Sequence, residues 1–109
     1  MSRLDFYVNY ELQASIKLED EEVTVGRDPK CTVQIPDAKV SRKHALISVE
    51  TDGYAIENFG SNGTRVNGSE ITDRSPLSPG DAIFISSYIL VYQSDDAPVD
   101  EMASTVFAG

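Results

Sequence analysis

Three short clusters of hydrogen-bonding residues carry most of the polar chemistry available to this sequence. They are residues 26–27 (Gly-Arg), residues 41–44 (Ser-Arg-Lys-His) and residues 61–64 (Ser-Asn-Gly-Thr). Such a set of donors suits a dianionic phosphate, because arginine offers a planar fork of donors and charge-assisted hydrogen bonds are strong. A serine hydroxyl and an asparagine amide add directional donors. The three clusters together predict a phosphate-binding site.

The distribution of charge along the chain is uneven. The sequence has 18 acidic and 9 basic residues, for a formal net charge of −9, yet residues 24–49 hold five basic and two acidic residues. Nucleic-acid binding needs many phosphate-facing Lys and Arg, and an anionic membrane surface repels an acidic protein. We therefore expect neither as a partner. The local positive charge is equally compatible with ordinary solvated surface, and Arg27 taken alone would be expected to pair with Asp28 or Asp37.

His44, the single histidine, invites a catalytic or metal-binding interpretation. A metal site needs further ligands, and the sequence has only one cysteine, Cys31. We interpret Cys31 as a small buried apolar group. Ser41 and His44 lie three residues apart on an expected loop, and no third residue is indicated that would orient a catalytic histidine. We interpret His44 as a hydrogen-bonded structural residue and expect no metal, no cofactor and no enzymatic activity.

The elements that must position these clusters are short β-strands. No window of eleven or more residues keeps a clean helical repeat of apolar residues. Residues 12–18 alternate Leu, Ala, Ile and Leu with polar residues, which predicts a strand with one buried face. Further short strands are expected at residues 6–8, 23–26, 32–35, 45–49, 54–59, 64–66, 70–71, 82–85 and 88–92.

Turn signals separate these strands. They are Asp52-Gly53, Asn62-Gly63, Asn67-Gly68 and Pro79-Gly80. Asn-Gly pairs favour positive φ and suit tight hairpins. Many short strands at regular spacing predict an all-β fold, either a β-sandwich or a barrel. The three clusters fall on expected loops, which is where binding residues of such folds usually sit.

Residues 94–109 differ in character from the rest. They hold four acidic residues, no basic residue and only scattered apolar ones. We therefore expect one domain over residues 1–93, followed by an acidic flexible tail or linker over residues 94–109, in a chain that is itself a fragment of a larger protein. The sequence has no secretory signal and no apolar stretch near the ~20 residues of a membrane helix, so we expect a cytoplasmic protein.

The clusters, in this order, resemble the pattern of the forkhead-associated (FHA) domain, a phosphothreonine-binding β-sandwich. That pattern is Gly-Arg, then Ser-x-x-His, then Asn-Gly followed by a second Asn-Gly turn. This sequence carries the pieces at residues 26–27, 41–44, 62–63 and 67–68, and the resemblance extends over residues 23–92. It implies a sandwich of two mostly antiparallel sheets with the binding loops at one rim.

The resemblance also implies a role for each matching residue. Some positions are expected to touch the phosphothreonine peptide, and others only shape the loops. The implied phosphate contacts are Arg27, Ser41 and Arg42; the implied contacts to the peptide main chain are Ser61 and Asn62; Lys39 is a possible specificity residue; and Gly26, His44 and Gly63 are structural.

The function implied is a phosphothreonine-dependent binding module in Ser/Thr kinase signalling, which recognises partners after a kinase has added the phosphate. The alternative is a sandwich that binds its partners without phosphate, as a scaffold or oligomerisation domain, and an isolated hydrolytic enzyme is a distant third. Thr105 is a possible phosphorylation site, and its phosphorylated form is a possible ligand for the site in the same or a neighbouring molecule.

Overall fold

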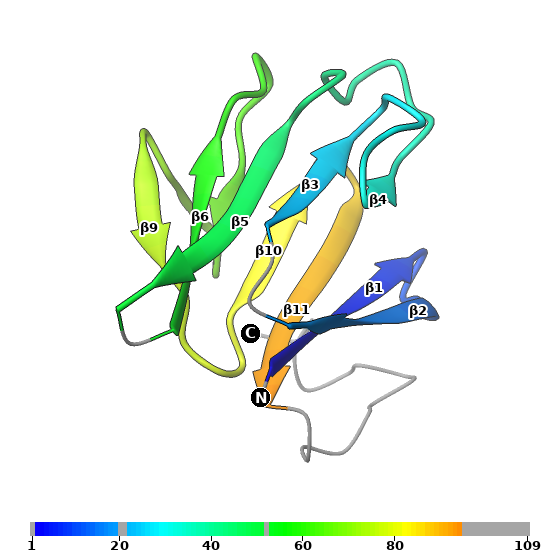
Figure 1. The fold of residues 1–109 in the computed structure, drawn as a ribbon. Helices are drawn as coiled ribbons and strands as arrows, with labels where there is room; N and C mark the ends of the chain where they lie inside the picture. Colours follow the sequence, from blue (N-terminus) through cyan, green and yellow to red (C-terminus); the bar gives the residue numbers. More distant parts are fainter. Residues whose placement is uncertain (1, 20–21, 52, 95–109) are drawn as a thin grey trace.

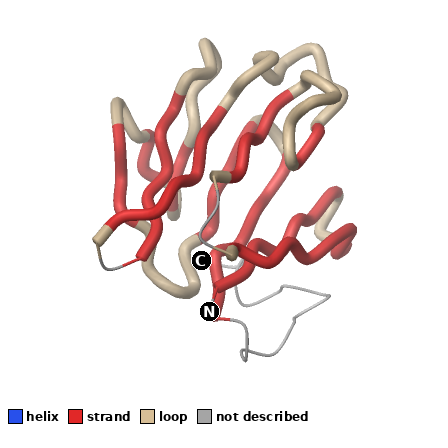
Figure 2. Tube along the Cα trace, in the orientation of Figure 1, coloured by secondary structure: helices blue, strands red, loops and turns tan. Residues whose placement is uncertain are grey.

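The computed structural model of the chain describes residues 2–19, 22–51 and 53–94 as two packed β-sheets (Figures 1 and 2). A six-stranded sheet has the order β2-β1-β11-β10-β7-β8, and a five-stranded sheet has the order β4-β3-β5-β6-β9. All pairings are antiparallel except the parallel pair of β3 and β4. The expected sandwich is confirmed. Its strands are β1 (Ser2–Val8), β2 (Glu11–Leu18), β3 (Val23–Gly26), β4 (Val33–Gln34), β5 (Ala45–Glu50), β6 (Gly53–Asn58), β7 (Arg65–Val66), β8 (Ser69–Glu70), β9 (Arg74–Pro76), β10 (Ala82–Ile85) and β11 (Tyr88–Ser94).

The main hydrophobic core lies between the two sheets. Leu4 and Leu90 from one sheet, and Val25, Ile47 and Ile56 from the other, belong to one cluster and are fully buried. Each belongs to a strand in which apolar residues at every second position face inward. This core fixes the relative position of the sheets, and hence of the loops that join them.

The alternating sequence of β2 predicts one continuous row of apolar side chains on one face of the strand, and the structure differs. The pairing of β1 with β2 shifts register between Phe6 and Tyr7, so that Phe6 pairs with Ala14 and Tyr7 pairs with Leu12. Such a bulge sends the following side chains to the other face of the sheet. Leu12 therefore packs with Tyr7 on the outer face, whereas Ile16 packs against the main core.

Two strand segments were not expected from the sequence. β1 begins at Ser2 rather than at Phe6, because Leu4 and Phe6 alternate with the buried polar pair Arg3 and Asp5 and so carry the period-two pattern to the start of the strand. The edge strand β9 has the sequence Arg-Ser-Pro, which gives no apolar signal, and it pairs only with β6. Backbone hydrogen bonds rather than side-chain pattern define this strand.

One end of the sandwich carries the loops that hold the three polar clusters (Figure 1, top). These loops join β3 to β4, β4 to β5 and β6 to β7. The hairpin at Asn67 and Gly68 has positive φ at both residues, 52° and 88°, as the Asn-Gly pair predicts. The part of the chain that the structure describes contains no helix of the length and apolar character that a membrane crossing needs.

Candidate functional site

Backbone hydrogen bonds bring the first two clusters together. The Arg27 N–H donates to the Ser41 carbonyl at 3.0 Å, and the Asp28 N–H donates to the Arg42 carbonyl at 3.2 Å. Gly26 lies in the same contact, since a Cβ at this position would collide with the Arg42 carbonyl oxygen. The glycine therefore allows the β3–β4 loop and the β4–β5 loop to run side by side.

The third cluster joins the second through Ser41, and Asn62 binds the β4–β5 loop just before it. The Ser61 N–H donates to Ser41 Oγ at 3.2 Å, and Asn62 Nδ2 donates to the Lys39 carbonyl at 2.7 Å. The three clusters, which are separate in the sequence, thus form one hydrogen-bonded surface. The hydroxyl proton of Ser41 remains available for a ligand, because Ser41 Oγ acts as an acceptor in this contact.

His44 lies beneath this surface and is fully buried. Its Nδ1 accepts from the Ser41 N–H at 3.1 Å, and its Nε2 lies 2.8 Å from the Gly63 carbonyl. Since Nδ1 accepts, the ring proton belongs on Nε2, which donates to Gly63. The imidazole therefore connects the second cluster to the third from inside the protein. Both ring nitrogens therefore have protein partners.

Gly60 leaves the room that the imidazole occupies, and it was not among the residues expected at the site. A Cβ at Gly60 would collide with the His44 ring. Beside it, Asn58 Oδ1 accepts from the Gly60 N–H at 3.1 Å and from the Thr64 hydroxyl at 2.8 Å. Asn58 thereby fixes the β6–β7 loop from within. In the sequence it was only one residue of an alternating strand, so nothing signalled this role.

The Arg27 side chain is exposed and is oriented by its own loop. Arg27 Nε donates to the Val40 carbonyl at 3.0 Å, a contact that does not use the terminal guanidinium nitrogens. The three ion pairs among the described residues involve Arg3 or Arg74, so the pairing of Arg27 with Asp28 or Asp37 is not formed. The guanidinium is therefore positioned but not neutralised.

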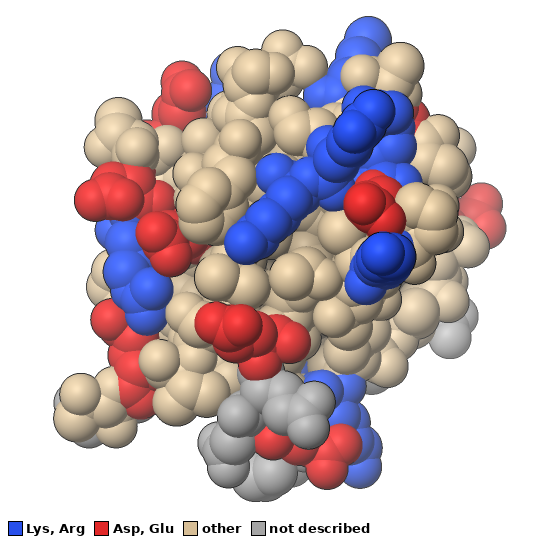
Figure 3. Space-filling model, turned by 45° about the horizontal axis from the view of Figure 1, so that its top comes forward, with Lys and Arg blue, Asp and Glu red and all other residues tan. Residues whose placement is uncertain are grey.

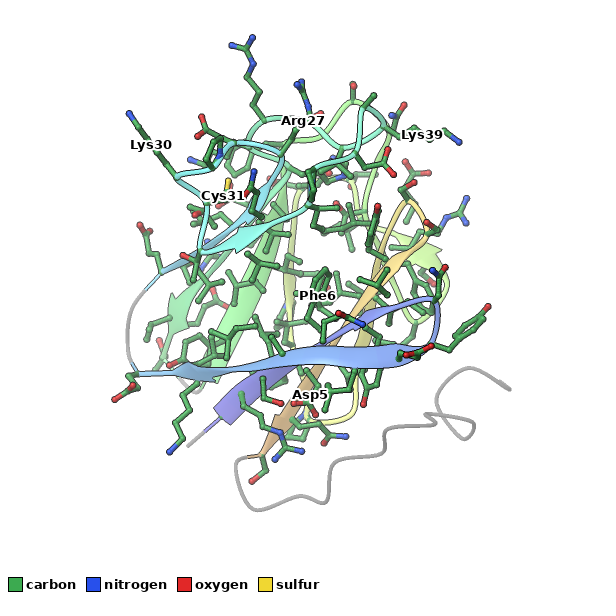
Figure 4. The ribbon with its side chains drawn as sticks, turned by 90° about the vertical axis from the view of Figure 1, so that its right-hand side faces the viewer. Asp5, Phe6, Arg27, Lys30, Cys31 and Lys39 are labelled. Atoms are coloured by element: carbon green, nitrogen blue, oxygen red, sulfur yellow. The ribbon has the colours of Figure 1, made fainter. Side chains whose placement is uncertain are left out.

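Other cationic side chains surround Arg27. Figure 3 shows Lys and Arg gathered on the end of the molecule that carries the loops, and Figure 4 places Arg27, Lys30 and Lys39 there. Arg42 is exposed, and Lys43 lies with its Nζ 4.8 Å from the centroid of the Phe59 ring. The positive charge that the sequence concentrates in residues 24–49 thus forms one surface, which we call the cationic rim (Arg27, Lys30, Lys39, Arg42 and Lys43).

A side-chain hydrogen bond attaches the β4–β5 loop to strand β11. The Tyr88 hydroxyl donates to Asp37 Oδ2 at 3.0 Å, and the Tyr88 ring stacks on Phe6 with centroids 6.3 Å apart. Hydrogen bonds from the Lys39 N–H and then from Tyr88 hold the pKa of Asp37 below its ordinary value of 3.8, against the opposing effect of desolvation. Partial burial and then the bond to Asp37 raise the pKa of Tyr88 above 10.0.

Cys31 does not lie where the sequence predicted it. Cys31 is half-buried rather than fully buried, and its thiol donates to the Arg42 carbonyl at 3.3 Å, so it helps to join two loops instead of filling the core. The described residues contain no group of three or more His, Cys, Asp or Glu that could hold a metal ion. The expected tail over residues 94–109 and Thr105 lie outside the described residues, except that Ser94 ends β11.

A sequence model of the FHA domain matches residues 23–86 of this chain. Among curated proteins, the "Oxoglutarate dehydrogenase inhibitor" of Corynebacterium jeikeium is 40% identical over 76 residues, which are 69% of this chain and 52% of that protein. The "Glycogen accumulation regulator GarA" of Mycobacterium tuberculosis is 33% identical over 90 residues, which are 81% of this chain and 55% of that protein. The chain thus spans about half the length of these relatives.

Two solved structures resemble the described fold closely. The FHA domain of the CT664 protein from Chlamydia trachomatis is 25% identical, with a TM-score of 0.78 over 85% of this chain and 96% of that chain. Mycobacterium tuberculosis EmbR in complex with a low-affinity phosphopeptide is 26% identical, with a TM-score of 0.76 over 91% of this chain and 26% of that chain.

Proposed function

The chain belongs to the FHA domain family, and from this membership we propose that it is a phosphothreonine-dependent binding module that carries out no reaction itself. One observation carries the proposal. The Arg27 guanidinium and the Ser41 hydroxyl lie on two hydrogen-bonded loops of the cationic rim, and no acidic side chain of the described residues forms an ion pair with Arg27. A phosphate group brings about −1.5 to −2 units of charge and three acceptor oxygens, which match these donors.

Each residue of the site has a distinct role in this proposal. Arg27 offers its terminal nitrogens to two phosphate oxygens, Ser41 donates its hydroxyl, and Arg42 adds a second cation. Asn62 and Ser61 bind the peptide main chain next to the phosphothreonine, with Asn62 held near it by its bond to the Lys39 carbonyl. The exposed Lys39 side chain lies beside this position and favours an acidic peptide residue.

The biological setting that we propose is a cytoplasmic Ser/Thr kinase pathway. A kinase phosphorylates the partner, and the module then recruits the partner to the protein of which it is a part. Two observations support a regulatory role. The relatives described above have the names of a regulator and an inhibitor, and the solved EmbR complex contains a phosphopeptide.

The chain itself offers one further candidate ligand. Thr105 lies eleven residues beyond the end of β11 at Ser94, and eleven residues span up to about 36 Å when extended. We propose that phosphorylated Thr105 competes for the site, within one molecule or between two. Tethering raises the effective concentration of such a ligand to about millimolar.

Titration with one peptide in Thr, phospho-Thr and phospho-Ser forms tests the main proposal. We expect binding of the phospho-Thr form, weaker binding of the phospho-Ser form and none of the unmodified form. Loss of one charge-assisted hydrogen bond costs about 1.5–3 kcal/mol, so Arg27→Ala and Ser41→Ala should each weaken binding at least tenfold. Arg74→Ala, which removes an arginine from the exposed pair with Glu50, is the matched control.

Two results would contradict the proposal. Equal affinity for the Thr and phospho-Thr peptides would favour the alternative, a scaffold that binds without phosphate. Unchanged affinity in both site variants would place the phosphate elsewhere on the surface. Thermal melting of every variant shows whether a loss of binding comes from a loss of fold.

A further inference from the structure

The cationic rim is larger than one phosphate group requires. Figure 3 shows Lys and Arg as an elongated band on this end of the molecule, and Figure 4 shows Lys30 and Lys39 on opposite sides of Arg27. The proposed phosphate contacts start at Arg27, and Lys39 lies beside the proposed peptide contact of Asn62. The part of the rim around Lys30 therefore has no ligand in the proposed function.

An open cavity lies at the Lys30 end of the rim. It has a volume of about 210 Å³. Its lining contains three cationic residues and one acidic residue, whereas the whole chain has a net charge of −9. The cavity is therefore a locally positive region of an acidic protein. The lining residues are Thr24, Asp28, Lys30, Cys31, Arg42 and Lys43.

The three cations of the cavity are not neutralised by the described part of the protein. Lys30, Arg42 and Lys43 are all exposed. The ion pairs of residues 2–19, 22–51 and 53–94 involve Arg3 or Arg74 instead. Asp28, the acidic residue of the lining, accepts the Lys30 N–H at Oδ1 at 2.8 Å, so its carboxylate takes part in the turn of its own loop.

Short contacts hold the walls of the cavity together. The Cys31 thiol donates to the Arg42 carbonyl at 3.3 Å, and the Cys31 N–H donates to the Asp28 carbonyl at 2.9 Å. The Nζ of Lys43 lies 4.8 Å from the centroid of the Phe59 ring. The loop that carries Lys30 is thus fixed to the loop that carries Arg42, which places the cations before a ligand arrives.

The cavity adjoins the proposed phosphate site. The backbone of residues 27–28 runs beside that of residues 41–42, with Arg27 next to Ser41 and Asp28 next to Arg42. The phosphate contacts lie at the first pair, and the cavity begins at the second. Lys30 is three residues from Arg27, at most about 10 Å along the backbone. An extended peptide advances ~3.3 Å per residue, so a side chain about two to four positions from the phosphothreonine reaches the cavity.

We propose that this cavity is a second anionic subsite, which binds a carboxylate or a second phosphate of the same peptide that carries the phosphothreonine. The inference rests on the proposed phosphothreonine-dependent function and adds a class of partner to it. The partner has an anionic side chain on the side of the phosphothreonine away from Lys39. The net charge of −9 repels such a peptide at long range, and the cations of the cavity offset this repulsion where the peptide lies.

Three peptides that share one phosphothreonine test the proposal. One carries two aspartates before the phosphothreonine, one carries two aspartates after it, and one has asparagines at all these positions. We expect each acidic peptide to bind about threefold to tenfold more tightly than the neutral one. The gain of one peptide should disappear in Lys30→Glu, and the gain of the other should disappear in Lys39→Glu.

Two further comparisons sharpen this test. Lys17→Glu is the matched control, because it makes the same change of charge at an exposed lysine of β2, outside the rim, and it should keep both gains. Phosphoserine in place of an aspartate distinguishes the two sources of the anion. A larger gain with phosphoserine assigns a second phosphate to the subsite, and an equal or smaller gain assigns a carboxylate.

The thiol of Cys31 reports on the cavity without any peptide, because it is the single cysteine of the chain and lies in the lining. An anionic and a neutral aromatic disulfide are reacted with this thiol, and the ratio of their rates follows the local potential. Relative to the parent, we expect this ratio to fall about twofold or more in Lys30→Glu and to stay unchanged in Lys17→Glu. The acidic peptide that depends on Lys30 should also slow both reactions.

Three results would overturn the subsite. They are the absence of any gain from aspartates at either end, a gain that persists unchanged in Lys30→Glu, and a rate ratio that does not respond to Lys30→Glu. A failure of the proposed function looks different. If the neutral phosphothreonine peptide does not bind, both proposals are contradicted, whereas a neutral peptide that binds without a gain from aspartates contradicts the subsite alone.

Discussion

Replacing His44 by alanine tests whether this residue stabilises the loops of the site rather than contacting the ligand. The ring is fully buried, and its two nitrogens satisfy the Ser41 N–H and the Gly63 carbonyl. Leaving a buried donor or acceptor without a partner costs about 1–3 kcal/mol each, and the cavity adds to this. We expect His44→Ala to lower the free energy of unfolding by about 3–5 kcal/mol, a large share of the ~5–15 kcal/mol of a typical domain.

Urea denaturation followed by circular dichroism measures this loss. The midpoint should fall while the slope stays near that of the parent, because the surface exposed on unfolding hardly changes. Gly60→Ala is a companion variant that crowds the ring without removing it, and it should also destabilise the fold. Ser41→Ala is the opposite case. It should keep nearly the parental stability, since among the described residues its side chain bonds only to the exposed Ser61 N–H.

One result would refute the reasoning about His44. If His44→Ala unfolded at the parental urea concentration and yet failed to bind a phosphothreonine peptide, the imidazole would act on the ligand rather than on the loops. Binding is therefore compared without urea, at a temperature at which circular dichroism shows that both proteins are folded.

Three further predictions concern salt, pH and the chain's own threonine. Phosphopeptide affinity should fall only modestly as the salt concentration rises, because screening weakens both the attraction by the cationic rim and the repulsion by the net charge of −9. A steep dependence of affinity on salt, in titrations at several salt concentrations, would contradict this. The bond from Tyr88 to Asp37 should stabilise the fold above pH 3.8 and lose this effect as the pH falls through the lowered pKa of Asp37. The same bond should be lost at high pH as the pH rises through the raised pKa of Tyr88. In thermal melts a Tyr88→Phe variant should lack this high-pH dependence and keep a reduced acid dependence, because the Lys39 N–H still lowers the pKa of Asp37. Phosphorylation of Thr105 should shift the amide signals of residues 41 and 62 or create dimers in the parent, and it should do neither in Arg27→Ala.

The all-β fold was accessible from the sequence because period-two alternation and glycine turns are local signals. β3 was predicted with its observed bounds, and β10 likewise. The failures have one cause. β9 lacks an apolar alternation, the start of β1 has a single apolar residue (Leu4) between two charged ones, and the bulge beside Phe6 reverses the face of Leu12 without any mark in the local pattern. Such features depend on the partner strand and not on the strand's own residues.

The three polar clusters and their chemistry were determined by the sequence itself. Residue type fixes what a group can donate, and a guanidinium, a hydroxyl and an amide suit a phosphate wherever the fold places them. Their roles as ligand contacts stay predictions until a peptide is bound. Cys31 shows the limit of such reasoning, since residue type favours a buried position and the loop contact with Arg42 leaves it half-exposed.

Only the tertiary structure decided how the clusters meet. Nothing local to Ser41 or Gly63 indicates that one imidazole holds both, or that Gly60 must lack a side chain to admit that ring. Nor does β1 or β11 alone show that their outer faces join into one buried apolar cluster. These facts arise from pairing between strands far apart in the chain, and the sequence of one strand carries no record of which neighbour it will have.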